Sequence, residues 1–264
     1  MTGNMRRHAT WGSVAVVMTI FKGIGEIPRV EALPNVIVMQ PDDLPFFDPW
    51  TSPTDNPTDP VQNPFPNGGD AYALPNLERL RTQGVQMLQA YTASPSCGTS
   101  RYSTITGKYP SRSAHGRDIF QNNEDRSSVT IPTTKLVDLN GQNDCSEENI
   151  AAAFQQNGYR TGMIGKWHLF DVKRSDYDYS TVQQSIRDCG FNFSEGIYVE
   201  NFGSFSDGSF SHNMEWVTKH AIDFINDDSS TDPFFLYFNP TVPHNDEDVE
   251  TAIKNFTCMD TPEG

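Results

Sequence analysis

Short apolar runs alternate with segments of helical periodicity along this chain. Runs of branched and aromatic residues predict strands at 35–39, 85–91, 159–167 and 234–238. Apolar positions spaced three or four apart predict helices at 74–84, 97–107, 147–157 and 214–225. Residues 45–70 are rich in Pro, Asp, Asn and Gly without periodicity, which predicts a long surface loop. The alternation predicts an α/β fold whose central sheet is mainly parallel and flanked by helices.

Composition and charge exclude some classes of protein. The 264 residues suffice for one large or two small domains and can bury a sizeable core. The formal net charge of −15 would repel a polyanion, so we expect no nucleic-acid partner. An acidic excess suits a secreted protein or one that binds hard cations.

The first residues resemble a targeting signal. Arg6 and Arg7 precede an apolar stretch at 11–21, and Gly23 and Gly25 offer small residues at a cleavage point. We therefore interpret residues 1–25 as a signal peptide, which predicts a secreted or lysosomal protein of the secretory pathway. The stretch is too short for a stable membrane span. A buried first strand or helix, or a misassigned start codon, is the alternative.

The cysteines and two glycosylation triplets fit the same compartment. Cysteines occur at 97, 145, 189 and 258, and the absence of a Cys-x-x-Cys pair excludes a zinc ribbon or a thioredoxin site. Cys145, Cys189 and Cys258 would supply one disulfide in an oxidising compartment, with its pairing left open. Asn192 and Asn255 each begin an Asn-x-Ser/Thr acceptor, which predicts a glycoprotein.

Charged side chains follow three of the predicted strands. Asp42 and Asp43 come after the first strand, Lys166 and His168 end another, and His244 follows the last. Because ligands bind outside the carboxyl ends of parallel strands, we expect these groups on one rim. Lys166 and His168, two apart on a strand, would point to the same face. Adjacent carboxylates favour a divalent cation such as Ca²⁺ or Mg²⁺, and a solvated turn is the alternative reading of that pair.

Cys97 stands at the predicted start of a helix, where free N–H groups and the helix dipole favour anions. Arg101, one turn further on, would face the same side and could form bidentate hydrogen bonds with an oxyanion. A cysteine flanked by Ser, Gly and Thr is poorly suited to a core.

Two motifs resemble the signatures of the sulfatase family in the alkaline-phosphatase-like superfamily. The first is Cys97-x-x-Ser100-Arg101 followed by Thr-Gly at 106–107, with Thr99 where the family usually has Pro. The second lies at 158–168 and ends in Lys166-Trp-His168. The resemblance runs from about residue 34 to about residue 244. It implies that residues 34–264 are the N-terminal part of a catalytic domain that lacks its C-terminal subdomain.

The resemblance implies a sulfuric ester hydrolase. A formylglycine-generating enzyme would convert Cys97 to formylglycine, whose hydrate attacks a carbohydrate or aryl sulfate ester. Asp42, Asp43 and residue 97 would ligate one Ca²⁺ ion. Arg101 would stabilise the formylglycine, and Lys166, His168 and His244 would bind the sulfate or its leaving oxygen. His115, downstream of the first signature, is a candidate base for sulfate release.

Two other functions stay open. One is a phosphonate or phosphodiester hydrolase of the same superfamily. The other is a non-catalytic protein, because the family completes its metal site with an Asp-Asn or Asp-His pair and a further Lys in a later segment. The acidic residues at 246–248 come too early for that role, so we expect an N-terminal part of a longer sulfatase.

Overall fold

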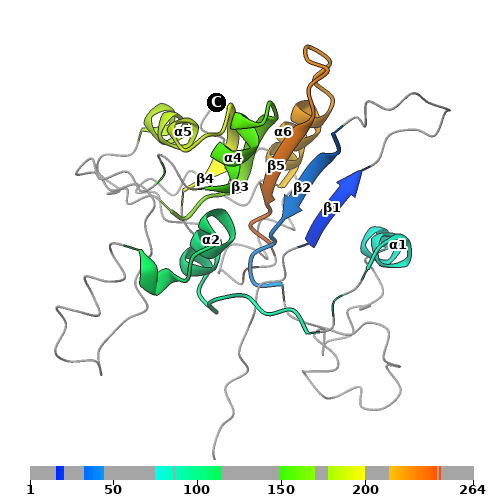
Figure 1. Cartoon of the computed structure of the whole chain (residues 1–264), viewed down its shortest axis with the longest axis vertical. Helices are drawn as coiled ribbons and strands as arrows, with labels where there is room; N and C mark the ends of the chain where they lie inside the picture. Colours follow the sequence, from blue (N-terminus) through cyan, green and yellow to red (C-terminus); the bar gives the residue numbers. More distant parts are fainter. Residues whose placement is uncertain are drawn as a thin grey trace, which may run out of the picture.

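A five-stranded sheet in the order β1-β2-β5-β3-β4 forms the centre of the computed structural model (Figure 1). The structure describes residues 16–20, 33–44, 75–85, 87, 89–113, 145, 149–169, 178–199, 214–242 and 244. The strands are β1 (Val16–Ile20), β2 (Asn35–Met39), β3 (Arg160–Lys166), β4 (Phe193–Tyr198) and β5 (Phe234–Asn239). Four of them run parallel, and β1 pairs antiparallel with β2. The predicted α/β fold with a mainly parallel sheet is confirmed.

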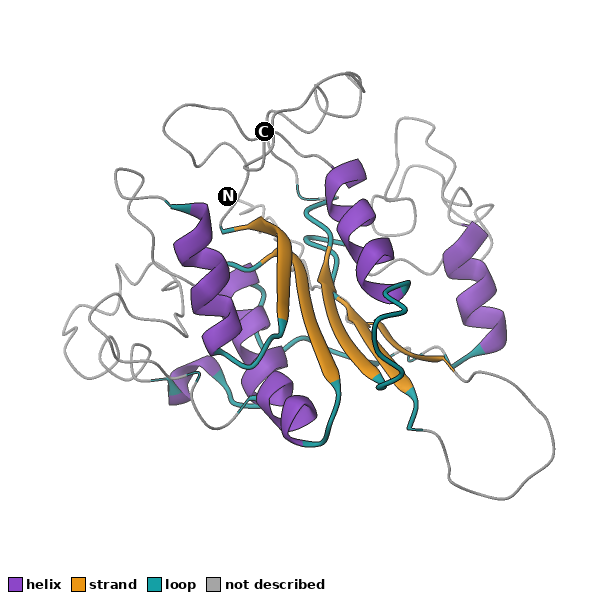
Figure 2. Cartoon of the chain, turned by 90° about the horizontal axis from the view of Figure 1, so that it is seen from above, coloured by secondary structure: helices purple, strands orange, loops and turns teal. Residues whose placement is uncertain are grey.

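Helices pack on both faces of the sheet (Figure 2). The helices are α1 (Pro75–Gln83), α2 (Cys97–Thr106), α4 (Ile150–Gln156), α5 (Tyr179–Asp188) and α6 (Met214–Ile225), with a 3₁₀ turn at Pro110–Arg112, and the last four α-helices pack on the sheet. One core cluster joins the sheet to α2, α4 and α5, and a second joins it to α6. Strand β5 supplies both clusters, with Phe235 and Tyr237 on one side and Phe234 and Leu236 on the other. A strand covered on both faces reads as a continuous apolar run, which is why β5 is easy to predict.

Two sequence predictions need correction. The strand expected at 85–91 is wrong, because the described residues of this stretch form coil and turn. Val85, Met87 and Tyr91 there are 87%, 72% and 90% exposed, so their apolar pattern has no sheet face to cover. The helix expected from residue 147 begins instead at Ile150. Its start is set by Asn149, whose side chain accepts a hydrogen bond of 2.9 Å from the Ala152 N–H and caps the helix.

The sequence analysis missed α5 and β4. In α5 the apolar side chains that reach the core, Val182 and Ile186, stand in an otherwise polar segment, which weakens the helical signal. Strand β4 carries Gly196 at a φ of 62°, a residue that lowers the strand signal.

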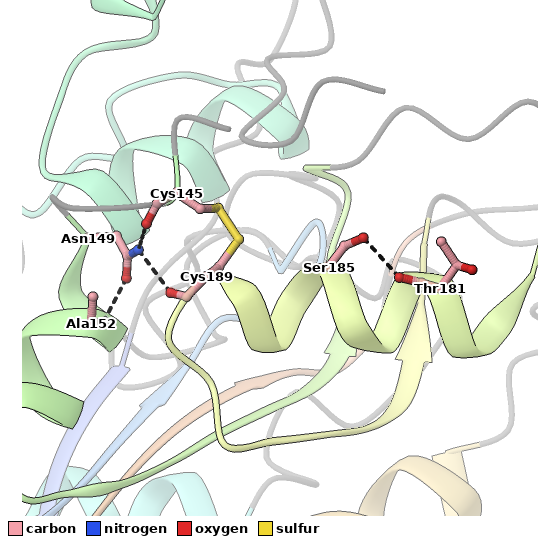
Figure 3. Close-up of a disulfide and its surroundings, with 6 residues drawn as sticks. All are labelled: Cys145, Asn149, Ala152, Thr181, Ser185 and Cys189. Carbon is pink, nitrogen blue, oxygen red and sulfur yellow. Dashed lines mark hydrogen bonds between the residues drawn. A yellow bond between two sulfur atoms is a disulfide. The ribbon is translucent and has the colours of Figure 1, made fainter. Parts of the chain in front are cut away.

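A disulfide between Cys145 and Cys189 decides the pairing that the sequence left open (Figure 3). Asn149 reinforces it, since its side-chain amide donates hydrogen bonds of 2.7 Å and 2.9 Å to the backbone carbonyls of the two cysteines. Cys97 is a free thiol. Cys258 lies outside the described residues.

The N-terminal prediction concerns processing, which the strand pairing of β1 does not test, so the signal peptide stays a prediction. Residues 1–15 and 21–32, the loop expected at 45–70 and the triplet at Asn255 lie outside the described residues. Within the described part of the chain, no helix combines the length and the apolar character that crossing a lipid bilayer requires.

Gly165 shapes the carboxyl end of β3. The register between β3 and β4 shifts between Ile164 and Gly165, and Gly165 has a φ of 95°. A Cβ at this position would lie 2.0 Å from the carbonyl oxygen of Asn239 on β5. Only glycine combines this backbone conformation with such close approach to a neighbouring strand, so it determines how the chain leaves β3.

We predict that Gly165→Ala destabilises the protein much more than Gly107→Ala. Both glycines have positive φ, but a Cβ at Gly107 would meet nothing within 4 Å. The control therefore carries only the conformational penalty, about 1 kcal/mol, whereas Gly165→Ala adds a clash with backbone. Urea unfolding of the two variants measures the difference, and equal unfolding free energies would contradict the close approach.

Candidate active site

The candidate site forms where β2, β3 and β5 end, beside the N-terminal end of helix α2. Backbone pairing continues past the ends of the strands, since the Gln40 N–H donates to the Phe238 carbonyl at 3.0 Å and the Asp42 N–H to the Pro240 carbonyl at 3.1 Å. These bonds fix Asp42 at the carboxyl edge of the sheet. The sequence prediction that strand ends bring charged groups to one rim is confirmed for Asp42 and Lys166.

Asp42 lies between two buried cations. Its carboxylate accepts a hydrogen bond of 3.2 Å from Arg101 Nη2 and a short one from Lys166 Nζ, and all three side chains are 1% exposed. Burial raises the pKa of Asp42, but the opposing charges of Arg101 and Lys166 prevail and lower it below 3.8. Two cationic side chains are thus held in place against one carboxylate at the carboxyl edge of the sheet. Their positive field favours an anion at this edge.

Arg101 is oriented differently from the sequence prediction. It was expected to fork onto an oxyanion, yet one terminal nitrogen binds Asp42 and the other donates to the Lys166 carbonyl at 3.0 Å. Only Nε is buried without a partner among the described residues. The physical reason is the buried carboxylate of Asp42, an opposite charge that attracts the guanidinium. Arg101 therefore ties α2 to β2 and β3.

His168 lies beyond the strand rather than on it. Strand β3 ends at Lys166, and His168 has a φ of 55°, so the predicted strand alternation does not orient the two side chains. Burial and the positive charges of Lys166 and Arg101 lower the pKa of His168 to about 3. Its Nδ1 is buried without a partner among the described residues. His168 is therefore a neutral imidazole with hydrogen-bonding capacity left over.

Asp43 and His244 lie at the outer side of the same rim. Their side chains approach to 3.6 Å between His244 Nε2 and Asp43 Oδ2, and Asp43 is 41% exposed. Asp43 has a φ of 59°, a left-handed conformation that Asp tolerates better than most residues. The two predicted residues are thus brought together. His115 lies outside the described residues.

Cys97 is the first residue of α2 and is partly accessible. Thr99, at the place where the signature usually has Pro, is buried and donates from its hydroxyl to the Ser96 carbonyl at 2.9 Å. Its hydroxyl also bonds the Ser94 hydroxyl. Proline in a first helical turn needs no N–H partner, and Thr99 stabilises the same turn through its side chain instead.

A polar network behind the rim was not predicted from the sequence. Gln40 joins β2 to α2 by donating to the Ser100 hydroxyl at 3.1 Å, and it accepts a hydrogen bond from Tyr237 on β5. Asn239 donates to the Lys166 carbonyl at 3.0 Å. Gln40 and Asn239 are polar residues at the ends of apolar runs, and that position was the available signal.

A family model of sulfatases matches residues 65–260, about three quarters of the chain. The chain belongs to the sulfatase family. Arylsulfatase H of Homo sapiens is 29% identical to it over 186 residues, which are 70% of this chain and 27% of that protein. Steryl-sulfatase of Homo sapiens is 30% identical over 168 residues, or 64% of this chain and 24% of that protein.

This sulfatase spans only part of its relatives. Alignment with the uncharacterized sulfatase YdeN of Escherichia coli (strain K12), at 26% identity, covers 80% of this chain and 41% of that protein. Among solved structures, the crystal structure of Ps i-CgsB is similar with a TM-score of 0.41 and 20% identity, covering 65% of this chain and 40% of that one. The chain thus spans between about a quarter and two fifths of these relatives.

The lowered pKa of His168 predicts how this sulfatase responds to acid. Between pH 6.5 and about 3 the unfolded chain binds a proton at His168 that the folded protein does not bind, so stability falls as the pH falls. We expect His168→Asn to reduce the slope of the unfolding free energy against pH by about 1.4 kcal/mol per pH unit between roughly pH 6 and 4.5. Urea unfolding at several pH values measures the slope. A variant at the exposed Thr218, Thr218→Ser, should keep the original slope, and an unchanged slope in His168→Asn would contradict the shift.

Proposed function

We propose that this sulfatase hydrolyses sulfate esters at the rim formed by α2, β2 and β3, with residue 97 as the nucleophile. The observation that carries the proposal is the buried ion-pair cluster at this rim, in which Arg101 and Lys166 are held in place against Asp42 beside the start of α2. A sulfate ester is anionic and gains negative charge on its oxygens as the ester bond breaks. Cations placed beforehand around those oxygens stabilise the transition state more than the substrate.

Residue 97 supplies the nucleophile in this proposal. Oxidised to formylglycine, it would provide the hydroxyl group of an aldehyde hydrate for attack on sulfur. Its place at the start of α2 suits an anion, because the backbone N–H groups of the first turn lack partners within the helix. Arg101 does not reach into solvent and acts as a positioning residue that holds α2 against Asp42 and Lys166.

Lys166 and His168 would orient the ester. The Lys166 ammonium is held against Asp42 and places positive charge near the departing oxygen. His168 stays neutral at physiological pH and can donate or accept one hydrogen bond through its unpartnered Nδ1. In this neutral form His168 would hydrogen-bond the sulfate or its leaving oxygen, because a pKa of about 3 makes it a poor proton acceptor.

Asp42 and Asp43 would hold a Ca²⁺ ion, which would neutralise charge on the bound ester. Hard carboxylate oxygens suit this cation, but it takes six to eight oxygens. Among the described residues there is no group of three or more His, Cys, Asp and Glu side chains that could hold a metal. Both oxygens of Asp42 are also engaged, with Arg101 and Lys166. Asp42 and Asp43 would therefore supply only part of a calcium site, in which the ion would compete with Lys166 for Asp42.

The nucleophile is tested by peptide mass spectrometry of residue 97. We expect the thiol of Cys97 to be replaced by an aldehyde or its hydrate when the chain is made together with a formylglycine-generating enzyme. Cys97→Ala should abolish turnover of an aryl sulfate. An unmodified thiol, or a faster turnover of the matched aryl phosphate than of the sulfate, would reject the proposal; the second result would favour a phosphodiester or phosphonate hydrolase.

Calcium titration by calorimetry tests the metal. Asp43→Asn keeps the size of the side chain and suits the left-handed backbone, but it removes an anionic oxygen, so calcium affinity should fall about tenfold or more. Lys166→Met removes the competitor for Asp42 and should tighten calcium binding. Asp223→Asn, which changes an exposed carboxylate on α6, should leave the affinity unchanged. Equal effects of Asp43→Asn and Asp223→Asn would show that Asp43 is only a turn residue.

A further inference from the structure

Asn192 lies at the opposite end of the sheet from the candidate active site. It immediately precedes β4, whereas Asp42 and Lys166 stand at the carboxyl ends of parallel strands. The residue is exposed, and its backbone N–H donates to Thr161 Oγ1 at 3.0 Å. Its side chain is held as well, because the carboxamide oxygen accepts a hydrogen bond of 3.1 Å from the Thr161 N–H.

This contact decides which way the carboxamide faces. A backbone N–H can only donate, so the atom of Asn192 next to the Thr161 N–H must be the oxygen. The amide nitrogen Nδ2 is then on the other side of the group. None of the described residues accepts a hydrogen bond from it, and Asn192 is exposed. The folded protein thus anchors the oxygen and leaves the nitrogen accessible.

The third residue of the Asn192-Phe193-Ser194 triplet is buried, in contrast to the exposed Asn192. Ser194 is 0% exposed, and its hydroxyl donates to the Gln183 carbonyl on α5 at 3.0 Å. A glycosylating enzyme that recognises the triplet through the Ser194 hydroxyl can reach it only before β4 packs against α5. Modification would therefore precede this packing step, and the exposed Asn192 would still accommodate an attached group afterwards.

We propose that Asn192 carries an N-linked glycan in the folded protein. The donor is an oligosaccharide linked to a polyprenyl diphosphate. The bond between the first sugar carbon and the diphosphate oxygen breaks, a bond from that carbon to Asn192 Nδ2 forms, the diphosphate leaves with the electron pair, and Nδ2 loses one proton. No oxidation or reduction takes place. The proposal rests on the secretory pathway that the sequence predicts for this chain, and it puts the glycan at the end of the sheet away from the candidate active site.

Expression of the full chain in a eukaryotic secretory host, behind an established cleavable leader, tests this site. Peptides are analysed by mass spectrometry after enzymatic deglycosylation in ¹⁸O water, which converts a glycosylated Asn into ¹⁸O-labelled Asp. We expect the label at Asn192. The matched variant Asn192→Asp keeps an oxygen to accept from the Thr161 N–H but lacks the amide nitrogen. It should lose one glycan step on a gel while keeping the unfolding midpoint of the deglycosylated parent.

The leader makes entry into the pathway independent of residues 1–25, so an unlabelled Asn192 in the secreted chain overturns the proposal. The same holds if the gel pattern of Asn192→Asp is unchanged. Asn255→Asp removes the second triplet and should leave the label at Asn192. Formylglycine at residue 97 and aryl sulfate turnover are measured on the same preparation, so failure of the glycan site and failure of the proposed function give different results.

Discussion

The buried carboxylate of Asp42 is the constraint on which the rest of the site depends. It binds Arg101 from α2 and Lys166 from β3, so three elements far apart in sequence meet at one side chain. Charges that are 1% exposed cannot be neutralised by water, and removing one partner from such a cluster typically costs about 3–5 kcal/mol. Asp42 therefore stabilises the fold and also fixes the positions of two cationic side chains at the rim. One carboxylate thus couples the stability of the sheet edge to the placement of the charges that the proposed reaction uses.

Backbone strain is concentrated next to this cluster. Asp43 and His168 are the two non-glycine residues with positive φ among those described, and each follows closely on a strand that ends at the rim. Such conformations typically cost about 1–3 kcal/mol each and persist where the surrounding contacts determine them. Pairing of β2 with β5 beyond their ends, together with the close approach of Gly165 to Asn239, supplies those contacts. The rigid strand ends therefore hold site residues in conformations that a free loop would avoid.

The residues that could be predicted from the sequence are those whose placement follows from local pattern. Strands β2 and β5 are apolar runs, and parallel strands bring their carboxyl ends together, which was enough to expect Asp42 near Lys166. The orientation of Arg101 could not be predicted, because it depends on competition between Asp42 and any ligand for one guanidinium. The predicted direction of the His168 side chain does not hold, because the positive φ of this residue interrupts the strand alternation. The sequence pattern does not indicate this positive φ. The position of Gln40 at the end of an apolar run marks it as a rim residue, but its partner Ser100 lies 60 residues away and is not indicated by any local pattern.

The cysteine chemistry connects the fold to the proposed reaction. Cys145 and Cys189 are buried, and their disulfide closes a loop with a sequence separation of 44, which by chain entropy stabilises the folded state by about 4 kcal/mol. Such a bond persists in an oxidising compartment. In that compartment an accessible thiol at Cys97 is exposed to disulfide exchange, unless the other cysteines have already found their partners. The amide of Asn149, which holds both carbonyls of the bridge, favours the pairing of Cys145 with Cys189. This pairing keeps Cys145 and Cys189 from exchanging with Cys97, whose free thiol the proposed oxidation requires.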